Sequence, residues 1–386
     1  MSNSTVIIIY QNSYDENQIY EKICAGTDAL GGIAHFAAPQ EKILVKPNFL
    51  TSDTPDGVTV TNPAVIRSVL KMFSDSGYSH VSMGDSPGHG TCKAVAAGIG
   101  LTEENLYGAA IAPMNEEVLT PFPEGKTANE FYFAREVTEA DAIINVCKMK
   151  THALETITGA VKNVYGLICG MRKAAGHVKY PNASIFARML ADIHLCVKPR
   201  LHIMDGISAM EGNGPGSGTP APMNLLLMSE DPVALDTVFC RLVYVDPQDV
   251  PTCAQGESCG IGTMQENEIT LKLIDKDKNG SLEAVPVTFN ELVSNYGNSS
   301  FNVLRTGKGK SFLARYSRFM THFQKKPAID TKICTHCGVC VSHCPVPGKA
   351  VSFANGREKP PVYDYSKCIR CYCCQEMCPS HAIKAK

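Results

Sequence analysis

Short apolar runs alternate with segments of helical periodicity along residues 1–245 of the chain. Runs of about four to eight apolar residues between turn residues are typical of buried strands. Strands are therefore predicted at residues 5–10, 42–46, 80–84, 142–146, 201–205 and 225–228. Helices are predicted at residues 15–30, 62–76 and 231–243. This alternation predicts an α/β fold, with helices on both faces of a mostly parallel sheet.

The pattern changes after residue 246. Residues 247–301 are less regular and include a predicted hairpin at 268–287 that turns at Asn279-Gly280. We assign this excursion to the first domain. That domain then spans residues 1–304, with its core at residues 43–245.

Residues 305–326 form a basic linker in which apolar residues recur at near-helical spacing. A helix that docks between two domains is predicted here, because such spacing places the apolar side chains on one face. The basic residues leave binding to a membrane surface as the alternative.

The tail at residues 327–386 contains the spacing Cys-x2-Cys-x2-Cys-x3-Cys-Pro twice, beginning at Cys334 and again at Cys368. In two-cluster ferredoxins, three cysteines of one motif and the last cysteine of the other hold each [4Fe–4S] cluster. The predicted ligands are Cys334, Cys337, Cys340 and Cys378 for one cluster, and Cys368, Cys371, Cys374 and Cys344 for the other. Cys373 interrupts the second motif and is not a predicted ligand. Zinc sites use paired cysteines with a longer spacer, and the tail resembles the small α+β fold of bacterial two-cluster ferredoxins.

Composition narrows the class of protein. The chain has 36 Lys and Arg against 38 Asp and Glu, so its formal net charge of −2 provides no overall positive field for nucleic acid. No apolar run reaches the length of a membrane span. The 17 cysteines, without a secretory signal, indicate a reducing and oxygen-poor cytoplasm. Cys253 and Cys259 match no common metal-binding spacing and are either a redox pair or a coincidence.

Polar residues follow several predicted strands at the point where each strand ends. In parallel sheets, ligands bind at this edge, where the carboxyl ends of the strands meet. The residues concerned are Lys46, Asn48, Asp85, Ser86, Lys148, Lys150, Thr151, His152 and Asp205. Thr158, Lys162 and Asn163 lie near them on a predicted helix.

These residues suggest a binding site for an anion. The predicted cationic mouth consists of Lys46, Lys148, Lys150 and Lys162, which suit a carboxylate or phosphate. His152, Asp85 and Lys150 are the catalytic candidates, because each could move a proton, and the others would bind substrate. Ordinary turns with solvated lysines are the alternative. The Gly-rich segment 212–218 is either a mobile loop over this site or a flexible connection.

Several short strings occur together and in order across residues 43–245. They are Val45-Lys-Pro-Asn48, Thr61-Asn-Pro63, Gly84-Asp-Ser-Pro87, Lys148-Met-Lys-Thr-His152, Thr158-Gly-Ala160, Lys162-Asn163, Asp205-Gly206, Glu211-Gly-Asn-Gly-Pro215 and Asp231-Pro-Val-Ala234 with Asp236. The set resembles the domain of unknown function 362 family, which is often fused to a two-cluster ferredoxin domain. This resemblance implies an α/β fold related to lactate racemase-type proteins and the binding of iron–sulfur clusters. It implies no catalytic residues.

The expected function is that of an iron–sulfur oxidoreductase with two [4Fe–4S] clusters. Electrons from a donor such as a ferredoxin or flavoprotein would pass through the clusters to a small anionic substrate at the strand ends. One alternative is a non-catalytic electron carrier or maturation factor that docks a protein partner. Another is a non-redox enzyme with structural or sensing clusters. No dinucleotide-binding fingerprint is present, so neither a flavin nor a nicotinamide cofactor is predicted.

Overall fold

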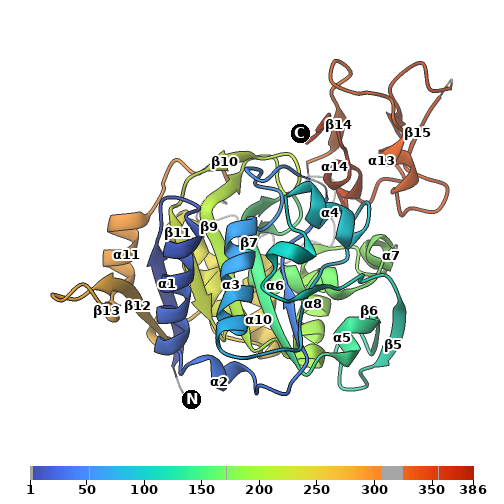
Figure 1. Cartoon of the computed structure of the whole chain (residues 1–386). Coiled ribbons are helices and arrows are strands. Elements are labelled where there is room, and N and C mark those ends of the chain that lie inside the picture. Colours follow the sequence, from blue (N-terminus) through green and yellow to red (C-terminus); the bar gives the residue numbers. More distant parts are fainter. Residues whose placement is uncertain (1–2, 52, 171, 304, 306–324, 355) are drawn as a thin grey trace.

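The computed structural model describes residues 3–51, 53–170, 172–303, 305, 325–354 and 356–386. A large α/β body carries a small cysteine-rich domain on one side (Figure 1). The helix predicted in the linker at residues 305–326 falls almost entirely outside the described residues.

The body is built on one mixed sheet of eleven strands, in the order β13-β12-β1-β11-β9-β7-β2-β3-β4, with β10 beside β9 and β8 beside β7. The strands are β1 (Ser4–Tyr10), β2 (Ile43–Lys46), β3 (Val81–Met83), β4 (Ala110–Ile111), β7 (Ala142–His152), β8 (Thr156–Thr158), β9 (Leu201–Glu211), β10 (Thr219–Ala221), β11 (Leu225–Ser229), β12 (Ile269–Lys276) and β13 (Leu282–Val287). All six predicted strands are present.

The sheet is mostly parallel, as predicted. β7 pairs in parallel with β2 on one side and with β9 on the other. β3 and β4 continue in parallel beyond β2. β11 is the exception in the centre of the sheet, because it runs antiparallel to both β1 and β9.

Two central strands are longer than their apolar runs indicated. β7 continues to His152 and β9 to Glu211, so each has 11 residues. β8 and β10 pair antiparallel with these extensions and supply their backbone partners. Lys148, Lys150, Thr151 and His152 therefore lie within β7, and the prediction that they follow the strand was wrong.

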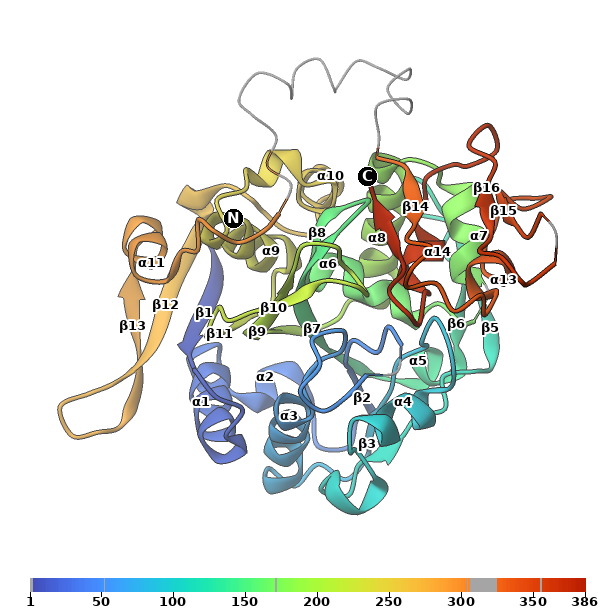
Figure 2. The ribbon, with the colours of Figure 1, turned by 90° about the horizontal axis from the view of Figure 1, so that it is seen from above.

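Helices cover both faces of the sheet, which confirms the α/β prediction (Figure 2). Along β1, Val6 and Ile8 join one hydrophobic core, whereas Ile7 and Ile9 join the other. α1 and α3 pack on the second core, and α8, α9 and α10 on the first. The helices of the body are α1 (Glu16–Ala29), α2 (Ile33–Phe36), α3 (Pro63–Asp75), α4 (Cys92–Gly98), α5 (Arg135–Glu139), α6 (Ala160–Asn163), α7 (Arg172–Lys179), α8 (Ala183–Val197), α9 (Pro232–Leu242), α10 (Pro251–Cys259) and α11 (Phe289–Tyr296).

Two hairpins lie at the edges of the body. The predicted hairpin after residue 268 is present as β12–β13, and β12 pairs in parallel with β1, so this excursion widens the main sheet. The sequence analysis missed a second hairpin, formed by β5 (Glu117–Pro121) and β6 (Glu130–Ala134). Asp192 of α8 holds the turn of that hairpin by accepting hydrogen bonds from the backbone N–H groups of residues 126–128.

The cysteine-rich domain has the small α+β arrangement expected of the tail. Two short ribbons pair β14 (Pro327–Ile329) with β17 (Ile383–Ala385), and β15 (Val351–Ser352) with β16 (Val362–Tyr363). Each cysteine motif contains one short helix, α13 (Val339–Ser342) or α14 (Cys373–Glu376). Among the described residues, no helix of either domain is long and apolar enough to cross a membrane.

Candidate site between the sheet and the cysteine-rich domain

A cavity of about 900 Å³, counted with its opening to solvent, lies between the ends of the sheet strands and the cysteine-rich domain. Eight predicted residues line it: Asn48, Asp85, Ser86, Lys148, Lys150, Thr158, Lys162 and Asn163. Four others lie buried behind its wall: Lys46, Thr151, His152 and Asp205. The strand ends thus converge on one space, while the roles of the individual residues stay predictions.

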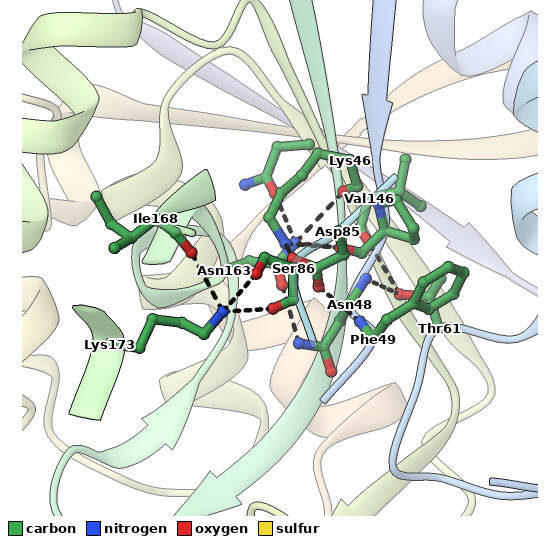
Figure 3. Close-up of polar contacts among 12 residues, drawn as sticks. Lys46, Asn48, Phe49, Thr61, Asp85, Ser86, Val146, Asn163, Ile168 and Lys173 are labelled. Atoms are coloured by element: carbon green, nitrogen blue, oxygen red, sulfur yellow. Dashed lines mark hydrogen bonds and ion pairs between the residues drawn. The ribbon is translucent and has the colours of Figure 1, made fainter. Parts of the chain in front are cut away.

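Lys46 and Asp85 form a buried ion pair beneath the cavity (Figure 3), with 2.9 Å between Nζ and Oδ1. Lys46 also donates to the carbonyl of Pro47, and Asp85 Oδ2 accepts from the backbone N–H of Phe49. Burial lowers the pKa of Lys46, and the attraction to Asp85 opposes this shift. A Cβ atom at Gly166 would lie only 1.9 Å from Asp85 Oδ1, so this close packing requires a glycine.

Lys148 forms a second buried ion pair, because its Nζ lies 2.7 Å from Asp205 Oδ2. Tyr14, from the loop before α1, donates to Asp205 Oδ1 and contacts Lys148 Nζ at 3.0 Å. Burial and the Asp205 charge raise the pKa of Tyr14. Carboxylates thus neutralise the charges of Lys46 and Lys148, which are two of the four lysines in the predicted cationic mouth.

Lys150 has polar partners but no carboxylate partner among the described residues. Its Nζ donates to Asn48 Oδ1 at 2.6 Å and to the carbonyl of Thr59 at 2.9 Å. Burial, together with the nearby positive charges of Lys162 and Lys148, lowers the pKa of Lys150 to about 7. The Lys150 side chain can therefore exchange between its ammonium and its neutral amine form near neutral pH.

Asn48 connects Lys150 to a chain of buried amides. Asn48 Nδ2 donates to Asn163 Oδ1 at 3.0 Å, and Asn163 Nδ2 donates to Asn145 Oδ1 at 2.7 Å. Asn145 Nδ2 in turn lies 2.9 Å from His202 Nδ1. Asn145 Nδ2 also donates to the carbonyl of Ala160, which can only accept, so the chain directs each amide oxygen toward Lys150 and makes Asn48 Oδ1 its acceptor.

The sequence analysis missed two residues of α7 that line the cavity, Lys173 and His177. Lys173 Nζ donates to the carbonyl and hydroxyl oxygens of Ser86 and to the carbonyl of Ile168 (Figure 3). Burial lowers the pKa of Lys173 to about 8. The His177 ring stacks on Phe186 at 4.5 Å, and its buried Nδ1 has no hydrogen-bond partner among the described residues. Both residues lie on a helix outside the strand-end pattern, although their i, i+4 spacing placed them on one face.

His152 joins the body to the cysteine-rich domain, because its Nε2 lies 2.9 Å from Glu376 Oε1. Its Nδ1 accepts from the backbone N–H groups of Leu154 and Glu155, so the proton of the neutral ring is on Nε2. Burial and the charge of Lys162 lower the pKa of His152 to about 4. Burial raises the pKa of Glu376, but attraction to Lys162 and His152 outweighs burial and lowers this pKa to about 2. Glu376, which the sequence analysis missed, thus lines the cavity in place of His152.

The Gly-rich segment 212–218 supports the cysteine-rich domain and does not hang free over the site. Gln375 Nε2 of α14 donates to Asn213 Oδ1 at 2.8 Å and to the carbonyls of Asn213 and Gly214. Asn213 Nδ2 donates back to the carbonyl of Ile383. A Cβ atom at Gly216 would lie 2.9 Å from the carbonyl oxygen of Glu376, so glycine allows this close approach.

The first predicted set of cysteines surrounds a second cavity, of about 290 Å³. Cys334, Cys337, Cys340 and Cys378 all line it. Burial and the three neighbouring thiols raise the pKa of Cys340 to about 11, because four thiolates so close together repel one another. The backbone N–H of Ala382 donates to Cys378 Sγ at 3.3 Å, as expected for a thiolate ligand. These features fit a cluster whose positive irons neutralise the thiolates.

The second set shares the electrostatic features of the first, which are raised thiol pKa values and hydrogen-bond donors to sulfur. Burial raises the pKa of Cys368, and its neighbours Cys371 and Cys344 raise it further. Cys344 Sγ accepts from the backbone N–H of Ala350 at 3.3 Å, and Cys374 Sγ accepts from the Tyr363 hydroxyl at 3.1 Å. Among the described residues, no three Cys, His, Asp or Glu side chains converge as ligands of a single metal ion.

Cys373 lines the large cavity and lies between Cys371 and Cys374 in the chain. The second set of cysteines is therefore adjacent to the cavity.

Among the other cysteines, Cys253 contacts Cys240 with 3.9 Å between the sulfur atoms, so the spacing of Cys253 to Cys259 has no counterpart in the structure.

The fold and the cysteine sets define a class, an α/β protein that binds iron–sulfur clusters. Within that class, the chain belongs to the family described as domain of unknown function (DUF362), which matches residues 43–241. A 4Fe-4S dicluster domain matches residues 326–379. The chain is 33% identical to a thylakoid-associated protein of Synechocystis sp. over 264 residues, which are 67% of this chain and 80% of that protein.

Two solved structures show distant similarity. One is the lactate racemase apoprotein from Thermoanaerobacterium thermosaccharolyticum, with 14% identity and a TM-score of 0.39 over 61% of this chain and 56% of that one. The other is a Thermotoga maritima protein, with 13% identity and a TM-score of 0.36 over 69% of this chain and 62% of that one. The chain matches less than two thirds of either structure.

Replacing Cys373 tests whether it binds a cluster, as its neighbours Cys371 and Cys374 are predicted to do. We expect Cys373→Ser to keep the iron content of the wild type, whereas Cys371→Ser loses about half of it. The measurement is the content of iron and acid-labile sulfide in both variants after anaerobic purification. Equal loss of iron in the two variants would show that Cys373 is itself a ligand.

Replacing Lys148 should test the buried ion pair with Asp205. In Lys148→Met, the Asp205 carboxylate remains buried without its cation, and we expect the free energy of unfolding to fall by about 3–5 kcal/mol. Urea unfolding, followed by circular dichroism, measures this loss. The exposed Lys126→Met is the control, and an equal effect in both variants would contradict the assignment.

Proposed function

We propose that the protein is an iron–sulfur oxidoreductase, in which two [4Fe–4S] clusters pass electrons to a small anionic substrate bound in the cavity. The observation that carries this proposal is the position of Cys373. It lines the cavity, and its neighbours Cys371 and Cys374 are predicted cluster ligands. A substrate in the cavity would lie beside the cluster that those cysteines hold.

The charge of the cavity favours an anion. Lys150, Lys162 and Lys173 line it and form no ion pair among the described residues, although Lys162 attracts the Glu376 carboxylate across the cavity. Lys173 is already satisfied by three oxygen atoms of the chain. Lys150 and Lys162 are therefore the groups that would bind a carboxylate or phosphate.

The bound clusters would supply single electrons. Where the reduced substrate takes up a proton, Lys150 would supply it, since its pKa of about 7 suits transfer from Nζ near neutral pH. Asn48 Oδ1 and the Thr59 carbonyl hold that Nζ in place. Phe49, Leu50 and Met377 supply apolar surface to the cavity, which limits water beside the reacting atoms.

The cavity beside the second set of cysteines, although it opens to solvent, is the observation that favours this proposal over a carrier or maturation factor. A protein that only passes electrons to a partner needs no enclosed space beside a cluster. A non-redox enzyme with structural clusters would keep its activity when the clusters are held oxidised. The dependence of substrate turnover on reduced clusters therefore separates the two enzyme hypotheses.

Anaerobic purification followed by a metabolite screen tests the proposal directly. We expect about eight irons per chain, and clusters that dithionite reduces and a small carboxylate or phosphate reoxidises. Lys150→Gln should keep the irons while slowing the reoxidation at least about 100-fold, because it removes both charge and proton. Unchanged reoxidation in this variant would place the substrate elsewhere. Failure of every anion tested would contradict the proposed function.

The pKa of Lys150 predicts how substrate binding depends on pH. Burial lowers this pKa to about 7, so Nζ is charged below pH 7 and neutral above it. The concentration of anion that gives half-maximal reoxidation should rise by up to about tenfold per pH unit above 7. Lys150→Arg keeps its charge throughout, so its curve should lack this inflection between pH 6 and 9. An inflection that persists in the arginine variant would assign the titration to another group.

A further inference from the structure

The charges of the chain are distributed unevenly between its two parts. Residues 325–386 contain ten Lys and Arg against four Asp and Glu, although the whole chain has 36 against 38. Of the four acids, Glu376 faces the interior cavity and Asp364 pairs with Lys367. The surface of the cysteine-rich domain is therefore strongly basic, whereas the rest of the chain is acidic.

The two sets of cysteines face in different directions. Cys373 and His343, which adjoin ligands of the second set, line the cavity shared with the body. In the first set, Cys337 is exposed to solvent, although Cys340 and Cys378 are buried. Cys337 is the only exposed residue among the eight predicted ligands, so the first set is the more accessible one to an external electron carrier.

The ribbon β14–β17 presents lysines beside this exposed set. Ile329 and Ile383 of the ribbon line the cavity of the first cysteines, and Lys384 follows on the opposite face of β17. Lys326 precedes β14 and is exposed like Lys384. Lys326 and Lys384 therefore lie on the outer, solvent-facing side of the ribbon, whose inner side covers the first set of cysteines.

The turn after β14 adds a third lysine and an apolar side chain. Lys332 is exposed, and Ile333, which precedes the first cysteine motif, is 44% exposed. Asp330 holds this turn by accepting from the backbone N–H of Lys332. Lys326, Lys332 and Lys384 have no ion-pair partner among the described residues. We name the surface formed by these three lysines and Ile333 the donor face.

We propose that the donor face docks a small acidic electron-carrier protein, and that electrons enter the first cluster there. This inference rests on the proposed function and names the partner that would serve it. An acidic carrier would be attracted to the unpaired lysines, and the exposed Ile333, next to Cys334 in the chain, would supply apolar contact. In each transfer the carrier is oxidised by one electron and a cluster is reduced by one, without any covalent bond being made.

Stopped-flow reduction of the complete, cluster-loaded protein tests the donor face. The probes are a reduced acidic [2Fe–2S] ferredoxin, a reduced basic cytochrome-type carrier of low potential, and dithionite. The test variant is Lys332→Glu/Lys384→Glu. The control is Lys276→Glu/Lys278→Glu, which makes the same charge change on the β12–β13 hairpin at the far side of the body (Figure 1).

We expect the second-order rate with the acidic ferredoxin to fall about tenfold or more in the test variant at low salt, and to change less than about twofold in the control. Reduction by dithionite and the iron content should be the same in all proteins. The rate of the wild type with the ferredoxin should also fall with rising ionic strength. Equal rates in test and control variants, or a preference for the basic carrier, would overturn the proposal.

The outcomes also separate the donor face from the proposed function. If the ferredoxin rate falls in the test variant but no anion reoxidises the clusters, the donor face stands and the substrate proposal fails. If anions reoxidise dithionite-reduced protein but the test variant accepts ferredoxin electrons at the wild-type rate, the donor face fails and the substrate proposal stands.

Discussion

The candidate site depends on how the protein neutralises charge in its interior. A buried ammonium group is costly unless a carboxylate or several oxygen atoms surround it. Asp85 and Asp205 meet this requirement for Lys46 and Lys148 at the ends of β2 and along β7. Lys150 has only neutral oxygen partners, and burial together with the charges of Lys162 and Lys148 lowers its pKa to about 7. The structure therefore divides its lysines into those that hold the strand ends together and those that remain available to a ligand.

The same requirement links the two domains. Glu376 lies in the interior of the junction, where Lys162 and the Nε2–H of His152 stabilise its negative charge. Without the cysteine-rich domain, the end of the sheet would be an open basic surface. With it, the surface becomes a cavity that has cations on the side of the sheet and a carboxylate and cysteine on the other. Neither domain encloses this site by itself.

Glycines make the junction possible, because they allow backbone to approach where a side chain would collide. At Gly88 a Cβ atom would lie 2.5 Å from Met377, and at Gly216 it would lie 2.9 Å from the Glu376 carbonyl. Gly166 allows the Lys46–Asp85 pair to pack directly against the backbone in the same way. The Gly-rich segment after β9 is thus explained by close packing between the domains, although its composition is also typical of flexible loops.

The amino-acid sequence by itself determined six strands of the main sheet, three helices that cover it and the cofactor class. The six apolar runs became strands, because an apolar run between turn residues has few other stable solutions in water. The twofold cysteine spacing indicated iron–sulfur ligation and the pairing of Cys378 with the first motif, because local spacing reflects the geometry of a cluster. The polar residues that meet at the sheet edge could also be identified, since parallel strands bring their carboxyl ends together.

Only the tertiary structure decided which of those polar residues face the cavity. The partners of Lys46 and Lys148 lie far away in the sequence, and no local pattern shows that Asp85 and Asp205 neutralise them. Lys173, His177 and Glu376 come from helices outside the strand-end pattern, so their contribution depends on how α7 and α14 pack. The difference is physical: periodicity and ligand spacing are local properties of the chain, whereas burial and charge pairing arise only when distant segments meet.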